Sequence, residues 1–141
     1  FKTADWELNT AVDYRERFFH RPQNEFENEN CSQDWIVYGN DYVGAKELTV
    51  YPGKTAIVTD PCAYGCLVIQ GHGKLGNYDC ESPTLIHYGE LTADEFFVSK
   101  DAAAKGVTIT NTSKYEPLVI LKHFGPDGKI LQGCGTRKMN K

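Results

Sequence analysis

Short runs of strand-forming residues, separated by turn residues, make up most of this chain from Asp34 onward. The runs are rich in Val, Ile, Thr, Tyr and Phe, and Gly, Pro, Asn or Asp separates each run from the next. Short strands that recur about every 8 to 12 residues between such turns are typical of an all-β sandwich or barrel. The expected strands cover residues 35–38, 45–51, 54–59, 64–70, 73–78, 84–87, 95–98, 107–111, 118–124 and 129–132.

Turn and helix signals fit between these strands. Pro52 and Gly53 predict a tight turn, because proline presets φ and glycine accepts the left-handed conformation. One short helix is expected over residues 99–105, where Ser99 is a good N-cap, three alanines follow and Gly106 ends the turn. The sequence therefore predicts an all-β domain with one short helix.

The 141 residues are enough for one domain with a buried core. Residues 1–33 are polar and irregular in pattern, and we expect them to form an arm that wraps outside the fold. Residues 34–141 are expected to form the barrel, with a short basic tail that contains Arg137, Lys138 and Lys141.

Charge and hydropathy argue against two classes of partner. The formal net charge of −4 disfavours binding to a nucleic-acid backbone, and the basic tail is interpreted as a solvated chain end. No apolar run approaches the roughly 20 residues that a membrane-spanning helix needs. We therefore expect neither a nucleic-acid partner nor a membrane partner.

The five cysteines predict reduced thiols. An odd number of cysteines without a secretory signal favours the cytosol, so a cytoplasmic location is expected. Cys62 and Cys66 are four residues apart, which is not the Cys-x-x-Cys spacing of redox or zinc sites, and buried, inert thiols are expected instead. The sole methionine is Met139, so we expect the chain to be processed or, preferably, a domain excised from a larger protein.

Several segments resemble, in chain order, the two sequence motifs of the cupins, which are small jelly-roll barrels built as a double-stranded β-helix. Residues 48–53 resemble the start of the first cupin motif, and residues 66–73 resemble its last strand and glycine turn. Residues 88–90 resemble the Gly-Asp that opens the second motif, and residues 111–113 with 116–118 resemble its end. The resemblance implies an all-β, cupin-type jelly-roll barrel over the stretch from Leu48 to Phe124.

The usual cupin metal ligands are replaced in this sequence. Cupin enzymes usually hold a metal through His-x-His and a Glu in the first motif and a His in the second. The corresponding positions here are Thr59, Pro61, Tyr64 and Val107. Proline and valine cannot ligate a metal, and threonine and tyrosine are poor ligands for a divalent transition metal. The resemblance therefore implies the fold without the usual chemistry, and we expect no metal and no cofactor.

A narrower resemblance is to the C-terminal barrel of two-barrel cupins related to class I mannose-6-phosphate isomerase. In that family the metal and the sugar phosphate sit in the other barrel, and the C-terminal barrel has commonly lost its ligands. The resemblance implies a sugar or sugar phosphate as the small-molecule partner and a catalytic domain elsewhere.

Alternation along two strands selects the candidate ligand-binding residues. If Tyr64 faces the barrel interior, then Cys66 and Gln70 face it too, because side chains alternate across a strand. With Lys122 expected in solvent, His123 turns inward on the last strand. The candidates are therefore Tyr64, Cys66, Gln70 and His123, which would line one mostly apolar cavity. The alternative is a filled core in which Tyr64 and His123 are satisfied by the backbone.

Two functions of different classes fit these observations. The first is a non-catalytic, sugar-related binding or scaffolding module of a larger protein. The second is a metal-independent sugar or sugar-phosphate isomerase or epimerase that uses His123 and Tyr64 as acid and base. No Asp is positioned in the sequence to orient His123, as an epimerase of that type would require.

The first expected strand predicts a partner for its edge. Residues 35–38 read Trp-Ile-Val-Tyr, which is too apolar for an open sheet edge. Either the N-terminal arm or a second copy of the chain must cover this strand. Because closed two-fold pairs are the commonest oligomers, we expect a homodimer with Trp35 and Tyr38 at or near its interface.

Overall fold

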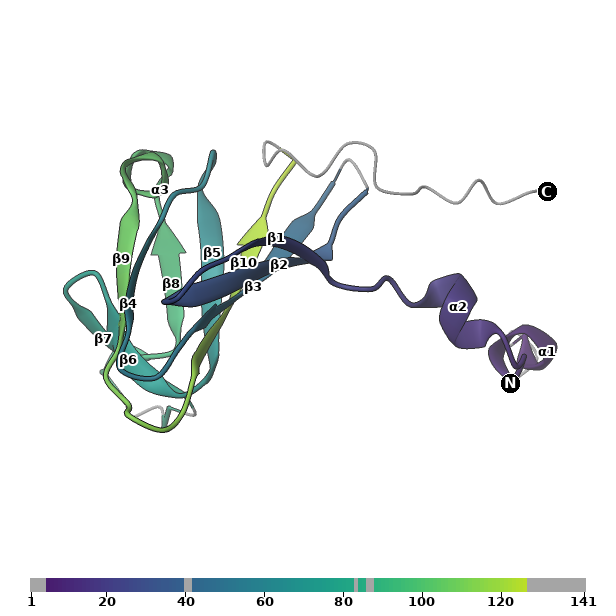
Figure 1. Ribbon diagram of the computed structural model, residues 1–141, viewed down its shortest axis with the longest axis horizontal. Coiled ribbons are helices and arrows are strands. Elements are labelled where there is room, and N and C mark those ends of the chain that lie inside the picture. Colours follow the sequence, from purple (N-terminus) through teal and green to yellow (C-terminus); the bar gives the residue numbers. More distant parts are fainter. Residues whose placement is uncertain (1–4, 40–41, 83, 86–87, 127–141) are drawn as a thin grey trace.

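The barrel consists of two antiparallel sheets that face each other (Figure 1). The computed structural model describes residues 5–39, 42–82, 84–85 and 88–126. Within them, the first sheet has the strand order β1-β2-β3-β10-β5-β8, and the second has the order β4-β9-β6-β7. The strands are β1 (Gln23–Glu27), β2 (Cys31–Val37), β3 (Gly44–Val50), β4 (Thr55–Val58), β5 (Tyr64–Gln70), β6 (His72–Leu75), β7 (Tyr78–Glu81), β8 (Glu95–Val98), β9 (Val107–Asn111) and β10 (Leu118–Phe124).

The core lies between the inner faces of the two sheets, because alternate residues of each strand point inward. In the first five residues of β2 and of β5, for example, every second residue is buried and the residues between them are partly exposed. Both sheets contribute to one hydrophobic cluster, and its fully buried members include Leu48, Val50, Ile109, Leu118 and Ile120. The prediction of an all-β fold is confirmed.

Most of the expected strands are present, with local differences. The expected strand 73–78 is part of a hairpin, since β6 and β7 pair and Gly76, at φ 60°, lies in the two-residue turn between them. Residues 84 and 85 are not in a strand. The rest of the expected strand 84–87 and the whole of 129–132 lie outside the described residues.

The predicted turn and helix are confirmed. Gly53 has a φ of 69° in the turn between β3 and β4. Helix α3 (Lys100–Lys105) begins after Ser99, whose hydroxyl accepts a hydrogen bond from the Ala102 amide, and it ends at Gly106 with a φ of 97°. Helix α3 fixes the loop after β4, because the Asp60 amide donates a 3.0 Å hydrogen bond to the carbonyl oxygen of Ala103.

The N-terminal arm is only partly irregular. Helices α1 (Trp6–Asn9) and α2 (Tyr14–Phe18) lie away from the two sheets (Figure 1). The following strand, β1, pairs with β2, which begins at Cys31 and not at Trp35 as expected. The sheet therefore begins within the predicted arm. None of the helices in the described residues is long and apolar enough to span a membrane.

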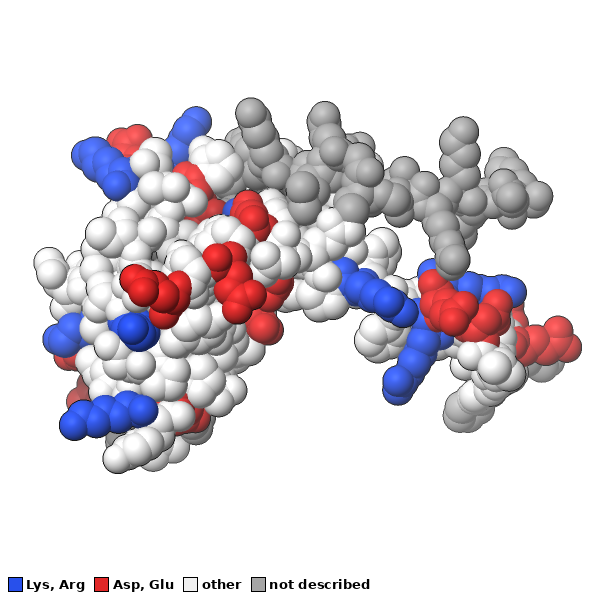
Figure 2. Space-filling view, viewed as in Figure 1, with Lys and Arg blue, Asp and Glu red and all other residues white. Residues whose placement is uncertain are grey.

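Strand β1 answers the question of what covers the apolar edge. It pairs with β2 as far as Trp35, which is only 4% exposed, and the Tyr38 hydroxyl donates a 2.7 Å hydrogen bond to the carbonyl oxygen of Arg21. The chain's own arm therefore covers part of the expected edge. The homodimer stays a prediction. Acidic side chains gather on the face of the molecule that β1 crosses (Figure 2).

Candidate functional site: a polar ring inside the barrel

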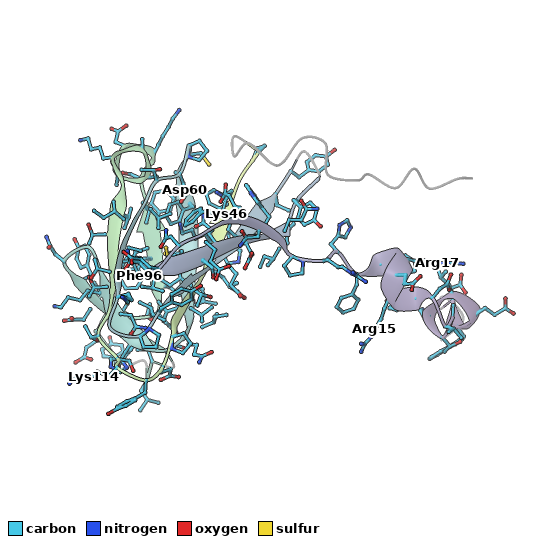
Figure 3. All side chains as sticks on the ribbon, viewed as in Figure 1. Arg15, Arg17, Lys46, Asp60, Phe96 and Lys114 are labelled. Carbon is cyan, nitrogen blue, oxygen red and sulfur yellow. The ribbon has the colours of Figure 1, made fainter. Side chains whose placement is uncertain are left out.

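Five polar side chains form a closed ring of hydrogen bonds and ion pairs at the inner face of the first sheet. We call this set the polar ring; its members are Glu25, Gln33, Lys46, Asp60 and Lys122. They come from β1, β2, β3, the loop after β4, and β10. Lys46 and Asp60 lie close together within the barrel in Figure 3.

Asp60 joins the two lysines of the ring. Its Oδ1 atom is 2.9 Å from Lys46 Nζ, and its Oδ2 atom is 2.8 Å from Lys122 Nζ. The side chains of Asp60 and Lys122 are 0% exposed, and that of Lys46 is 4% exposed. One carboxylate therefore holds two buried ammonium groups, which is an arrangement that depends on every charge being paired.

The other half of the ring runs through an amide. Gln33 accepts a 2.8 Å hydrogen bond from Lys122 Nζ and donates a 2.6 Å hydrogen bond to Glu25 Oε2. Glu25 closes the ring, with Oε2 2.8 Å and Oε1 3.0 Å from Lys46 Nζ. The two ammonium groups and two carboxylates give the ring no net formal charge.

Strand alternation places the two lysines in the core. On β3, Lys46 shares its face with Leu48 and Val50, and on β10 Lys122 shares its face with Ile120 and Phe124. Because the neighbours on each face are fully apolar, turning either lysine outward would expose its hydrophobic neighbours to water. The apolar pattern therefore decides where the lysines point, and the ring supplies their partners.

A β-bulge aims Glu25 at the ring. The pairing of β1 with β2 shifts between Asn24 and Phe26, which face Asp34 and Gln33. Glu25 is therefore the extra residue of a bulge, a feature that re-aims a side chain relative to its strand. The bulge explains how Glu25, on an edge strand, contacts Gln33 and Lys46 in the barrel interior.

Aromatic rings and opposing charges set the electrostatics of the lysines. Lys46 Nζ lies 4.5 Å from the centroid of the Trp35 ring and 5.3 Å from that of Phe124, within the range of cation–π attraction. Burial lowers the pKa of Lys122, the Asp60 carboxylate opposes that shift, and the second ammonium, on Lys46, adds to it.

The hydroxyl of Tyr64 has no hydrogen-bond partner. Among the described residues, it is the one buried side-chain nitrogen or oxygen atom without a hydrogen-bond partner. Tyr64 is only 2% exposed. The phenol group of Tyr64 lies beside the polar ring, because Lys122 Nζ is 5.0 Å from the centroid of the Tyr64 aromatic ring. Burial and the nearby Asp60 carboxylate both raise the pKa of Tyr64, so the phenol keeps its proton and can donate it.

The predicted cavity residues are divided between the two faces of the sheet. Tyr64 and Cys66 face the interior, as predicted. Gln70 and His123 are exposed, so the prediction that they face inward is wrong. The phase of β10 is the reverse of the expected one, because Lys122 is the buried residue and His123 is the solvent-facing one.

This reversal separates the proposed acid–base pair. Register pairs His123 with Gly65, the neighbour of Tyr64, so the two side chains project from opposite faces of the sheet. A buried phenol and an exposed imidazole on opposite faces cannot act on one bound molecule. The isomerase or epimerase mechanism through His123 and Tyr64 therefore has no site.

The cysteines of the interior are not activated. Burial raises the pKa of Cys66 to about 11, although the Lys122 ammonium acts in the opposite direction. Burial also raises the pKa of Cys80 to about 11. Both thiols are therefore protonated at neutral pH, which is the opposite of what a nucleophilic cysteine needs.

The four positions that correspond to cupin metal ligands do not converge. Thr59 and Pro61 are exposed, Val107 is half-buried, and Tyr64 alone is buried. Asp60, the residue between the two exposed positions, is the one that faces inward. Over the described ranges, no three His, Cys, Asp or Glu side chains cluster as metal ligands would.

Sequence reasoning missed the polar ring, although part of the signal was available. Lys46 alternates with Leu48 and Val50, and Asp60 continues the alternation of Ala56 and Val58. Both could have been placed inside by following the apolar face. The position of Glu25 could not have been found in this way, because a bulge breaks the alternation.

Comparison with known proteins gives the fold. No family model matches the sequence, and a search of curated proteins finds no match. Among solved structures, the polyketide cyclase RemF from Streptomyces resistomycificus aligns with a TM-score of 0.53 and 11% identity, over 78% of this chain and 79% of RemF. A cupin 2 domain-containing protein from Halorhodospira halophila aligns with a TM-score of 0.50 and 18% identity, over 74% of this chain and 70% of the other. The barrel has the cupin fold.

A third similar structure shows the same barrel within a larger chain. The complex of Rhodobacter sphaeroides SigE with the anti-sigma ChrR contains a chain that aligns with a TM-score of 0.52 and 13% identity, over 79% of this chain. The alignment spans 52% of that chain, about half its length. At these identities the likeness shows the fold alone, and the narrower resemblance to mannose-6-phosphate isomerases stays a prediction.

Proposed function

We propose that this chain is a non-catalytic cupin module that binds a small polar molecule, of the sugar or sugar-phosphate class, inside its barrel. The observation that carries this proposal is the Tyr64 hydroxyl, which is buried beside the polar ring without a partner. Leaving a buried hydroxyl unpaired costs about 1–3 kcal/mol. A ligand that accepts its hydrogen bond would recover that cost.

The pairing within the polar ring supports binding over catalysis. Asp60 and Lys122 hold each other, and Glu25 and Lys46 do the same, so each charged group already has a partner of opposite charge. General acid–base catalysis needs a group that can give or take a proton at a reacting atom. In the polar ring these groups are engaged with one another.

The chemistry of the interior supports a sugar-like ligand. Ammonium, amide, carboxylate and phenol groups lie together there, beside the aromatic rings of Trp35 and Phe124. Ligand sites combine such apolar and aromatic walls with a few polar groups that fix orientation. The resemblance to sugar-isomerase barrels adds a reason to test sugars first.

The experiment is a calorimetric titration of the chain with mannose and with mannose 6-phosphate. We expect binding of at least one of them to wild type, a binding constant weakened at least tenfold in Tyr64→Phe, and unchanged binding in the control Tyr78→Phe, whose side chain is exposed. A parallel turnover assay should detect no product. Turnover would contradict the non-catalytic part of the proposal, and equal binding by wild type and Tyr64→Phe would contradict the assigned site.

A further inference from the structure

Glu25 differs from every other member of the polar ring in its exposure. Its side chain is 33% exposed, whereas those of Lys46, Asp60 and Lys122 are at most 4% exposed, and Gln33 is 1% exposed. Solvent therefore reaches the polar ring at Glu25, and we call this point of the ring the opening. The glutamate closes a cationic site whose other walls lie within the barrel.

The groups behind Glu25 are arranged to hold a carboxylate. Lys46 Nζ contacts both oxygens of the Glu25 carboxylate, and the Gln33 amide donates a 2.6 Å hydrogen bond to one of them. Trp35 and Phe124 flank the ammonium and keep the Lys46 side chain in place. Without Glu25, the ammonium groups of Lys46 and Lys122 would have only the Asp60 carboxylate to balance them. The site would then carry one net positive charge at the opening.

We propose that Lys46 and Gln33 form a binding site for a small, singly charged carboxylic acid, and that Glu25 occupies this site in the ligand-free chain. On binding, the carboxylate of the ligand replaces that of Glu25, and strand β1 moves away from the opening. This inference goes beyond the proposed sugar binding at Tyr64 and does not depend on it.

Strand β1 is built so that it can leave. It is an edge strand of five residues whose backbone pairs with β2 alone, and the bulge at Glu25 interrupts that pairing. Phe26 is the residue of β1 that packs against the hydrophobic core. Edge segments with few buried contacts open at the lowest free-energy cost.

The charge around the opening favours a monoanion. Acidic side chains gather where β1 crosses the surface (Figure 2), and Glu27, two residues from Glu25, accepts a 2.8 Å hydrogen bond from Tyr51 there. A phosphate dianion would meet more repulsion from this surface than a carboxylate would. The net single positive charge of the emptied site also matches one negative charge.

The first arm of the test is chemical rescue. In Glu25→Ala, sodium acetate should raise the urea midpoint, with the folding constant increasing about elevenfold at an acetate concentration ten times its dissociation constant. Sodium chloride and inorganic phosphate at equal ionic strength should give no comparable rise. The matched control Glu27→Ala, and Glu25→Ala combined with Lys46→Met, should show no specific response to acetate.

The second arm uses the wild-type chain and does not require any variant to fold. Saturating acetate should speed amide hydrogen exchange at Phe26 and Glu27 in β1 at least severalfold, while chloride leaves it unchanged. Equal responses of Glu25→Ala to acetate, chloride and phosphate would overturn the carboxylate site. Exchange in wild-type β1 that ignores acetate would overturn the claim that a ligand replaces Glu25.

Discussion

Replacing Asp60 by asparagine tests whether the polar ring holds the barrel together. The substitution keeps the size of the side chain but removes the charge that both Asp60 oxygens offer to Lys46 and Lys122, at 2.9 and 2.8 Å. The new amide nitrogen would then face an ammonium group, with a donor against a donor. Both lysines are buried, so neither can turn to water without opening the core.

The expected loss follows from this burial. Removing one partner of a buried ion pair typically costs about 3–5 kcal/mol, because the other charge is left uncompensated. Asp60 serves two ammonium groups, one of which Glu25 also holds, so we expect the free energy of unfolding of Asp60→Asn to fall by about 3–5 kcal/mol at pH 7. Urea denaturation with an unchanged m-value measures this loss.

A matched control separates burial from charge. Asp79 pairs with Lys74 at 3.0 Å, and their side chains are 84% and 51% exposed. Exposed pairs of this kind contribute about 0–1 kcal/mol, so Asp79→Asn should be nearly neutral. If Asp60→Asn cost no more than Asp79→Asn, the conclusion that the ring is a buried, charged structure would be refuted.

A double-mutant cycle then isolates the contact. Lys122→Met removes the ammonium that Asp60→Asn leaves uncompensated, and Lys46 keeps Glu25 as its partner. Adding it to Asp60→Asn should therefore cost less than the sum of the two single changes, with a coupling energy of about 1–3 kcal/mol. Strict additivity would mean that the two side chains do not interact in solution.

Three further predictions concern backbone space, the outer face and the buried thiol. Gly73→Ala should lower stability by about 1–3 kcal/mol, because the added Cβ would collide with the carbonyl oxygen of Thr110. Gly65→Ala should be tolerated, because a Cβ there has no atom within 4 Å, and urea denaturation of both variants tests the difference. His123→Ala should change stability by less than about 0.5 kcal/mol and leave ligand binding intact, because the imidazole is exposed; a calorimetric titration that shows lost binding would contradict its placement. Burial raises the pKa of Cys66 from 9.0 to about 11, so the thiol's contribution to stability is complete below pH 9 and falls by about 1.4 kcal/mol per pH unit between about pH 9 and pH 11. A pH series that shows the same slope in this range for wild type and Cys66→Ala would contradict this assignment.

The fold could be predicted from the sequence because its signals are local. Short strands with turn residues between them, the N-cap at Ser99 and the glycine after α3 each act within a few residues. The N-cap, the glycine and most of the predicted strands are found in the structure. Strand β1 was missed because residues 23–27 include four polar side chains around one phenylalanine. Its strand conformation depends on pairing with β2, which the sequence of the segment alone does not reveal.

The site was less predictable because the interior carries charge. The general preference of lysine for water predicts Lys122 in solvent, and this one assumption reverses the phase of β10 and turns His123 inward. The apolar neighbours of Lys122 on its own face indicate the correct phase. The alternation of β5, extended to its last residue, predicts Gln70 inside, but Gln70 is exposed at the end of that strand.

The most direct test of the polar ring is nitrogen-15 NMR of the lysine ammonium groups. In wild type at neutral pH we predict two protected ammonium signals, from Lys46 and Lys122, whose protons exchange slowly with water because both groups are buried and hydrogen-bonded. In Asp60→Asn both signals should be weakened or lost, while Asp79→Asn should retain them. If all lysine ammonium protons of the wild-type chain exchanged as rapidly as those of exposed lysines, a closed, buried ring in this barrel would be contradicted.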